Sequence, residues 1–77
     1  MSVAADLIDV RTVPPPQRPP LIFGAFDALA PGEAFEIVND HDPLPLLAQL
    51  MERYGDGIEI SYVAREPGQI VIDFKRK

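Results

Sequence analysis

Three consecutive prolines, Pro14–Pro16, limit what the N-terminal part of this chain can form. A proline has no backbone N–H group and fixes its own φ angle, so three in a row cannot continue a β-ladder. The residues before them, from Leu7 to Val13, alternate apolar Ile8 and Val10 with charged neighbours. Such alternation is typical of a half-buried strand. The sequence therefore predicts a first strand that ends at the prolines.

A second pair of prolines, Pro19 and Pro20, stands where a helix can begin. The amides of the first helical turn have no partner within the helix, so proline is tolerated there. The apolar residues that follow, Ile22, Phe23, Phe26 and Leu29, have the spacing of one helical face. The turn signal Ala30-Pro31-Gly32-Glu33 comes next. We expect a first helix between the prolines and this turn.

A second helix is indicated between His41 and Gly55. Asp42 is expected to be its N-cap, with Pro43 at the first helical position. An apolar stripe follows and ends at Gly55, where a helix can stop. The stripe consists of Leu46, Leu47, Leu50, Met51 and Tyr54.

Three further segments alternate with period two and predict strands. From Ala34 to Asn39, Phe35 and Ile37 face one way and Glu36 the other. The third strand is expected to place Ile58, Ile60, Tyr62 and Ala64 on one face, with Glu59, Ser61 and Arg65 on the other. After the turn Glu66-Pro67-Gly68-Gln69, the last strand places Ile70, Ile72 and Phe74 on one face. This turn predicts an antiparallel hairpin.

The order βαβαββ predicts an α/β (α+β) fold, a two-layer sandwich with a four-stranded mixed sheet and both helices on one face. Residues 1–77 are expected to form a single domain, because a chain of 77 residues cannot build two cores. Residues 1–5 and 76–77 are expected to be flexible ends. Val63 and Val71 would lie on the uncovered face of the sheet and suggest a contact surface there.

Composition excludes several classes of function. The formal net charge is -5, with 7 Lys and Arg against 12 Asp and Glu, which argues against a nucleic-acid partner. The chain has no cysteine, so disulfides, thiolate nucleophiles and cysteine-ligated metals are excluded. It has no long apolar run and no signal-peptide pattern, so we expect a cytoplasmic protein without a membrane partner.

Short strings of residues along the chain occur together in a known family. They are Ile8-Asp9-Val10-Arg11 before Pro14-Pro15-Pro16, Ile22-Phe23 with Phe26-Asp27-Ala28-Leu29, Pro31-Gly32-Glu33 and Asn39-Asp40-His41-Asp42-Pro43. Over nearly the whole chain this arrangement resembles the bacterial domain family DUF2249. That family is in turn similar to the TusA-like (SirA-like) sulfur carriers, which share the βαβαββ order and a last strand antiparallel to the rest.

The resemblance also shows where this chain differs. In TusA-like carriers a Cys-Pro motif opens the first helix and carries a persulfide, and the place of that cysteine falls at about Pro15, which has no nucleophile. Other DUF2249 members have a histidine near Arg18 and tryptophans in the last two strands, where this chain has Pro19, Ile60 and Ile70. The resemblance implies a bacterial setting and an association with hemerythrin-like and other redox-associated modules.

Two loops are expected to meet at one edge of the sheet. The loop from Val13 to Arg18 and the loop from Asn39 to Asp42 both follow strands expected to be parallel, so both emerge at carboxyl ends beside helix N-termini. Open α/β sheets usually bind ligands at this edge. The candidate residues for binding a ligand or partner are Arg18, Asn39, Asp40, His41 and Asp42.

Three interpretations of these residues remain open. His41 could bind a transition metal, with Asp40 or Asp42 as oxygen ligands, or haem. The helix N-termini and Arg18 could bind an anion or another small ligand. Residues 39–43 could instead form a structural capping loop, with Asp42 and Pro43 as the cap.

No nucleophile accompanies His41 in its loop, so we expect a protein that is not an enzyme. We predict an accessory or regulatory module that binds an unidentified protein partner or a small ligand. The binding surface would be the two loops, residues 14–18 and 39–43. No cofactor is expected in this case. The alternatives are a metal- or haem-binding protein that uses His41, and a cysteine-less relative of the sulfur carriers.

Overall fold

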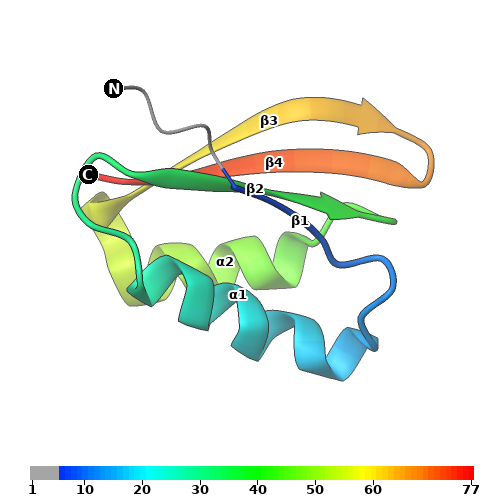
Figure 1. Ribbon diagram of the computed structural model, residues 1–77, viewed down its shortest axis with the longest axis horizontal. Coiled ribbons are helices and arrows are strands. Elements are labelled where there is room, and N and C mark those ends of the chain that lie inside the picture. The colour runs from blue at the N-terminus through cyan, green and yellow to red at the C-terminus, as the bar shows by residue number, and fades with distance from the viewer. Residues whose placement is uncertain (1–5) are drawn as a thin grey trace.

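The computed structural model describes residues 6–77 and contains the predicted βαβαββ order with two additional 3-10 turns. The elements are β1 (Asp6–Asp9), η1 (Pro15–Gln17), α1 (Arg18–Asp27), β2 (Ala34–Asn39), α2 (Leu44–Tyr54), η2 (Gly55–Gly57), β3 (Ile58–Glu66) and β4 (Gln69–Arg76). Figure 1 shows the sheet as one layer and both helices as the second layer, on the same side of the sheet. The predicted α+β sandwich is confirmed. The expectation for residues 1–5 lies outside the described residues.

The sheet is mixed, with the strand order β1-β2-β4-β3. β1 and β2 are parallel, whereas β4 is antiparallel to both of its neighbours, β2 and β3. β4 therefore runs against the other strands. Because β1 and β2 are adjacent and parallel, the loops that follow them leave the sheet at the same edge, as expected.

β1 is shorter than predicted, because it ends at Asp9 rather than at Val13. Beyond it, the backbone N–H of Val10 still donates to Val38 O over 3.0 Å. The Asp9 carboxylate then accepts from the backbone N–H of Arg11, and Val13 N–H donates to Val10 O, each over 3.0 Å. These bonds turn the chain, since a local aspartate contact competes with the ladder. The strand ends four residues earlier than the prolines require.

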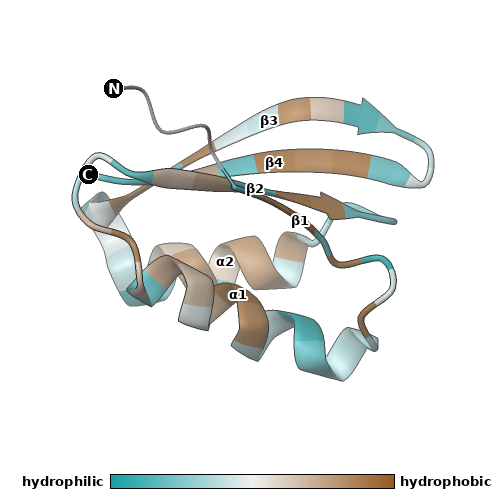
Figure 2. Cartoon of the chain, in the orientation of Figure 1, coloured by the Kyte–Doolittle hydropathy of each residue, from teal (hydrophilic) through white to brown (hydrophobic). Residues whose placement is uncertain are grey.

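The core fills the space between the sheet and the two helices. It consists of Val10, Ile22, Phe26, Phe35, Ile37, Leu46, Leu47, Leu50, Ile58, Ile72 and Phe74. Figure 2 shows hydrophobic colouring along the central strands and on parts of both helices. Met51 belongs to the predicted apolar stripe of α2 but is 61% exposed, because it lies at the margin of the face that Leu46, Leu47 and Leu50 bury. Neither described helix is long and apolar enough to cross a membrane.

A β-bulge at Val63 changes the faces of the residues that follow it in β3. Tyr62 pairs with Ile72, but the next pair joins Ala64 to Val71. Residues directly opposite one another in an antiparallel pair share a face. Ala64 therefore lies with Val71 on the open face, which has no helix, and Arg65 lies on the helix face. The prediction for these two residues was wrong, because a single inserted residue shifts the period-two pattern.

The C-terminal end is integrated into the fold. Arg76 belongs to β4, and its Nη1 atom donates to Leu29 O over 2.8 Å. Its backbone N–H donates to Glu33 O over 2.9 Å and its carbonyl accepts from Gly32 N–H over 2.6 Å. Lys77 N–H donates to Gly57 O over 3.0 Å. The structure therefore shows hydrogen-bonded backbone where residues 76–77 were expected to be a flexible end.

Candidate functional site

The start of α1 is placed by the prolines that precede and follow it. Pro15–Gln17 form the 3-10 turn η1, in which Gln17 N–H donates to Pro14 O over 2.9 Å. Arg18 is the first residue of α1, and two prolines follow it at positions that need no helical donor. This arrangement holds Arg18 at the helix N-terminus, next to the loop that leaves β2.

The side chain of Arg18 is only 8% exposed, and its guanidinium group joins the two loops. Its five hydrogen bonds run from Nε to Val13 O (2.8 Å), from Nη1 to Asn39 Oδ1 (2.9 Å) and Asp40 Oδ1 (3.0 Å), and from Nη2 to Arg11 O (3.2 Å) and Asp40 Oδ2 (3.4 Å). A guanidinium has five N–H donors, so every donor is used inside the protein. Arg18 therefore orders the loops and has no donor left for an anion.

Asp40 connects this guanidinium to the only histidine of the chain. Its Oδ1 atom, which accepts from Arg18, also lies 2.7 Å from His41 Nδ1. The hydrogen bonds from Arg18 and then from His41 lower the pKa of Asp40 to about 2. An ionised carboxylate only accepts, so His41 Nδ1 carries the hydrogen of this contact. In the neutral imidazole, Nε2 is then the acceptor.

Asp42 does not cap α2, so this prediction was wrong. The helix begins at Leu44, its N-cap position is Pro43, and no side chain caps it. The Asp42 carboxylate instead accepts from Tyr62 Oη over 2.5 Å and from Arg65 Nη2 over 3.2 Å. Pro43 is buried beside it. The carboxylate turns to β3 because Tyr62 lies on the helix face there, and the bulge brings Arg65 to the same face.

The structure brings together four of the five predicted site residues, Arg18, Asn39, Asp40 and His41, and directs Asp42 away from them. Sequence reasoning missed Tyr62 and Arg65. Their contacts with Asp42 span 20 and 23 residues, and that of Arg65 also depends on the bulge, so no local signal in the sequence points to them.

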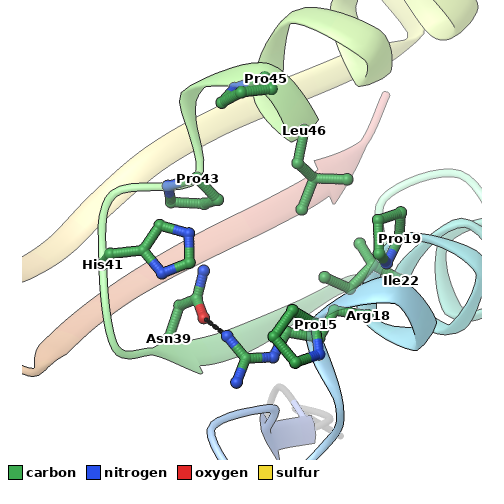
Figure 3. Close-up of a pocket in the computed structure, with 9 residues that line it drawn as sticks. All are labelled: Pro15, Arg18, Pro19, Ile22, Asn39, His41, Pro43, Pro45 and Leu46. Atoms are coloured by element: carbon green, nitrogen blue, oxygen red, sulfur yellow. Dashed lines mark hydrogen bonds between the residues drawn. The ribbon is translucent and has the colours of Figure 1, made fainter.

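A pocket of about 170 Å³ lies between the N-terminal ends of the two helices. It is lined by Pro15, Arg18, Pro19, Ile22, Asn39, His41, Pro43, Pro45 and Leu46. Figure 3 shows the proline rings and aliphatic side chains around its sides, with the imidazole and the Asn39 carboxamide between them. Most of the wall is apolar and only a few polar groups reach it, which is the usual character of a ligand pocket. Pro19, Ile22, Pro45 and Leu46 were not among the predicted site residues, and the prolines at the starts of the two helices are the only sequence signal that could have found them.

Metal ligands do not gather at this site. Within residues 6–77, no group of three or more His, Cys, Asp or Glu side chains is arranged to hold a metal ion. A metal at His41 would therefore take most of its ligands from elsewhere, since protein metal sites generally need three or four donors.

The comparisons with known proteins identify one family. No curated protein and no solved structure matches the chain. A family model described as "Uncharacterized conserved protein (DUF2249)" matches residues 7–76, which include every described helix and strand except the first residue of β1. The chain therefore belongs to the DUF2249 family.

Proposed function

We propose that this domain is a non-enzymatic accessory or regulatory module that binds a small ligand or a side chain of a protein partner. The binding surface is the pocket between residues 14–18 and 39–43. The observation that carries the proposal is this pocket, which is apolar on most sides and has one oriented imidazole at its wall. Pockets with this combination are the default candidates for ligand sites.

The rigidity of the walls supports a binding role. Arg18 ties both loops together with five hydrogen bonds, and four of the lining residues are prolines. Proline has little conformational freedom to lose, and a preorganised site retains more of its contact energy as affinity. The lining of the pocket has no hydroxyl, thiol or amine side chain that could act as a nucleophile.

The proposal is tested by NMR with a library of small neutral fragments. Binding fragments are expected to shift the amide resonances of Gln17, Arg18 and the non-proline residues of 39–46. His41→Ala should weaken this binding, whereas Lys77→Ala, a change at the opposite end of the sheet, should not. A matched capture experiment with the same variants tests for a protein partner. Fragments that shift only distant residues, together with equal partner recovery by both variants, would place the binding surface elsewhere.

A second candidate function is metal or haem binding through His41. The contact of Nδ1 with Asp40 favours it, because metal-ligating histidines commonly donate their other ring nitrogen to a carboxylate. Because no group of three or more ligating side chains gathers within residues 6–77, the ion or haem would need further ligands from elsewhere. Titration with zinc, copper or haem should then perturb the imidazole resonances at micromolar concentrations. A titration without any response would remove this candidate.

The biological setting is also part of the proposal. The resemblance to TusA-like carriers supports a bacterial, cytoplasmic protein that keeps the scaffold of a sulfur carrier. Without a cysteine the chain cannot carry a persulfide, so we assign it a binding role on that scaffold. Its net charge of -5 makes a protein or small molecule a better partner than nucleic acid.

A further inference from the structure

Asn39 is the one pocket residue whose polar side chain is almost completely buried and yet only half used. The residue is 3% exposed. Its Oδ1 atom accepts from Arg18 Nη1 over 2.9 Å and from the backbone N–H of Asp40 over 3.0 Å. Because both partners are donors, the oxygen must face them, and the carboxamide cannot turn over. The amide nitrogen is therefore held on the opposite side.

That nitrogen faces the pocket. Figure 3 shows Nδ2 of Asn39 directed away from Arg18 and toward the side of the pocket where His41 lies. Within residues 6–77, Nδ2 has no hydrogen-bond partner, and no fully enclosed side-chain nitrogen or oxygen lacks one. Nδ2 thus stays accessible from the pocket. A ligand with an acceptor atom in the pocket can therefore pair with this donor.

His41 supplies a complementary group on the same pocket. Its Nδ1 atom is occupied by Asp40, so Nε2 of the neutral ring is an acceptor. The wall thus presents one donor, on Asn39, and one acceptor, on His41. A ligand that satisfies both needs an acceptor oxygen next to a donor hydrogen.

The charges around the pocket favour an uncharged ligand. The only cation in the lining, Arg18, is neutralised by Asp40 and has no free donor. A carboxylate ligand would approach Asp40 without a cation to pair with, and a cationic ligand would lose its hydration against proline and aliphatic walls. Both charged classes are therefore disfavoured.

We propose that this pocket recognises a neutral carboxamide carried on a small apolar group, with Nδ2 of Asn39 donating to its carbonyl oxygen and Nε2 of His41 accepting from its N–H. This inference rests on the proposed binding function and specifies the ligand class. A carboxamide occurs both in free small molecules and in peptides, so the experiment includes a probe for each source.

The first test compares ligands on the unchanged protein by NMR titration. Isobutyramide has both the acceptor and the donor, 3-methyl-2-butanone has only the acceptor, and isobutyrate is charged. Isobutyramide is expected to bind about fivefold more tightly than the ketone and to shift the side-chain amide resonances of Asn39. N-acetyl-leucine methylamide represents a peptide. If it binds more tightly than isobutyramide, the source of the carboxamide is a peptide. If isobutyramide binds more tightly, the source is a free small molecule.

The second test uses variants that remove one contact each. His41→Ala should abolish the preference for the amide over the ketone, because only the amide donates to Nε2. Asn39→Asp keeps the acceptor for Arg18 and removes the NH2 group, so it should weaken both probes about fivefold or more. Gln49→Glu makes the same chemical change at an exposed site of α2 and should leave both affinities unchanged.

The outcomes separate this inference from the proposed function. If the ketone or isobutyrate binds in the pocket as tightly as the amide, carboxamide recognition is overturned while the pocket remains a binding site. If Asn39→Asp, shown to be folded by its spectrum, binds the amide unchanged, the inference also fails. If no probe binds, carboxamide recognition is overturned, and the capture experiment with His41→Ala decides on partner binding independently.

Discussion

Arg18 and Asn39 are 21 residues apart in the sequence, and Nη1 of Arg18 donates to Oδ1 of Asn39 over 2.9 Å in the interior of the protein. This bond joins the start of α1 to the end of β2. It also orients the Asn39 carboxamide, whose other end faces the pocket. This residue pair thus holds the two loops together and also sets which end of the Asn39 carboxamide faces the candidate site.

Replacing Arg18 should destabilise the domain strongly. Arg18→Ala is expected to lower the free energy of unfolding by about 3 kcal/mol, because it leaves acceptors from both loops without donors. Arg18→Lys should recover less than half of this loss, since an ammonium group cannot reach all of these acceptors. Urea denaturation followed by circular dichroism measures both effects.

Arg11 is the matched control for this prediction. Its ion pair with Asp9 has a distance of 2.7 Å but is exposed, so Arg11→Ala should destabilise the domain far less than Arg18→Ala. An Arg18→Lys variant as stable as the wild type would show that the network around Arg18 is dispensable.

Asp40 should make stability depend on acid pH. Its pKa is about 2 in the folded protein, against an ordinary value of about 3.9 in an unfolded chain. A carboxyl group with a lowered folded pKa stabilises the fold above its unfolded pKa, and this contribution is lost as the pH falls from about 4 to about 2. Asp40→Asn should therefore lower the Tm at pH 7 and have much less effect at pH 2. An equal loss at both pH values would contradict this role of the carboxylate.

Asp42 and Tyr62 should be energetically coupled. Tyr62→Phe removes the hydroxyl that donates to the Asp42 carboxylate and is expected to cost about 1 kcal/mol. Once Asp42→Ala is present, Tyr62→Phe should have little further effect, giving a coupling energy of about 1 kcal/mol in a double-mutant cycle. Tyr54→Phe is the control, because the Tyr54 hydroxyl donates to Asp27. If the stability losses of Asp42→Ala and Tyr62→Phe simply add in the double variant, Asp42 acts independently of Tyr62.

Asp73 should oppose folding at neutral pH. It lies on the open face opposite Glu36 of β2, and its burial, followed by the charge of Glu59, raises its pKa. An acid with a raised folded pKa favours the fold when it is protonated, so stability falls as the pH rises through its titration. Asp73→Asn should therefore raise the Tm at pH 7. This gain should disappear below about pH 3, where an ordinary carboxyl is protonated in the unfolded chain as well. A gain of the same size at both pH values would point to packing rather than charge.

Much of the fold follows from local patterns in the sequence. The alternation in residues 34–39 predicts β2 with the bounds that the structure shows, and Gly55 marks the end of α2. The prolines beside Arg18 predict where α1 begins. Such signals are readable because proline chemistry and hydrophobic period act within a few residues of the chain.

The prediction for Asp42 failed because contacts with distant residues replaced a local one. Asp42 has the residue type and position of a helix cap, but Tyr62 and Arg65 provide donors that its carboxylate uses instead. Tyr62 lies on the helix face as predicted, and the bulge at Val63 turns Arg65 to that face as well. A bulge adds one residue without changing the composition of a strand, so the alternating pattern does not reveal it.

The sequence determined the βαβαββ order, the absence of thiol chemistry and the two loops that meet at one edge of the sheet. Tertiary packing determined which atoms remain available there: the donors of Arg18 are consumed by the loops, whereas Nδ2 of Asn39 and Nε2 of His41 face outward from that network. Local residue types set which groups the chain carries. The hydrogen bonds between segments set which of those groups remain unused, because each donor and acceptor can serve only partners that the fold places within reach.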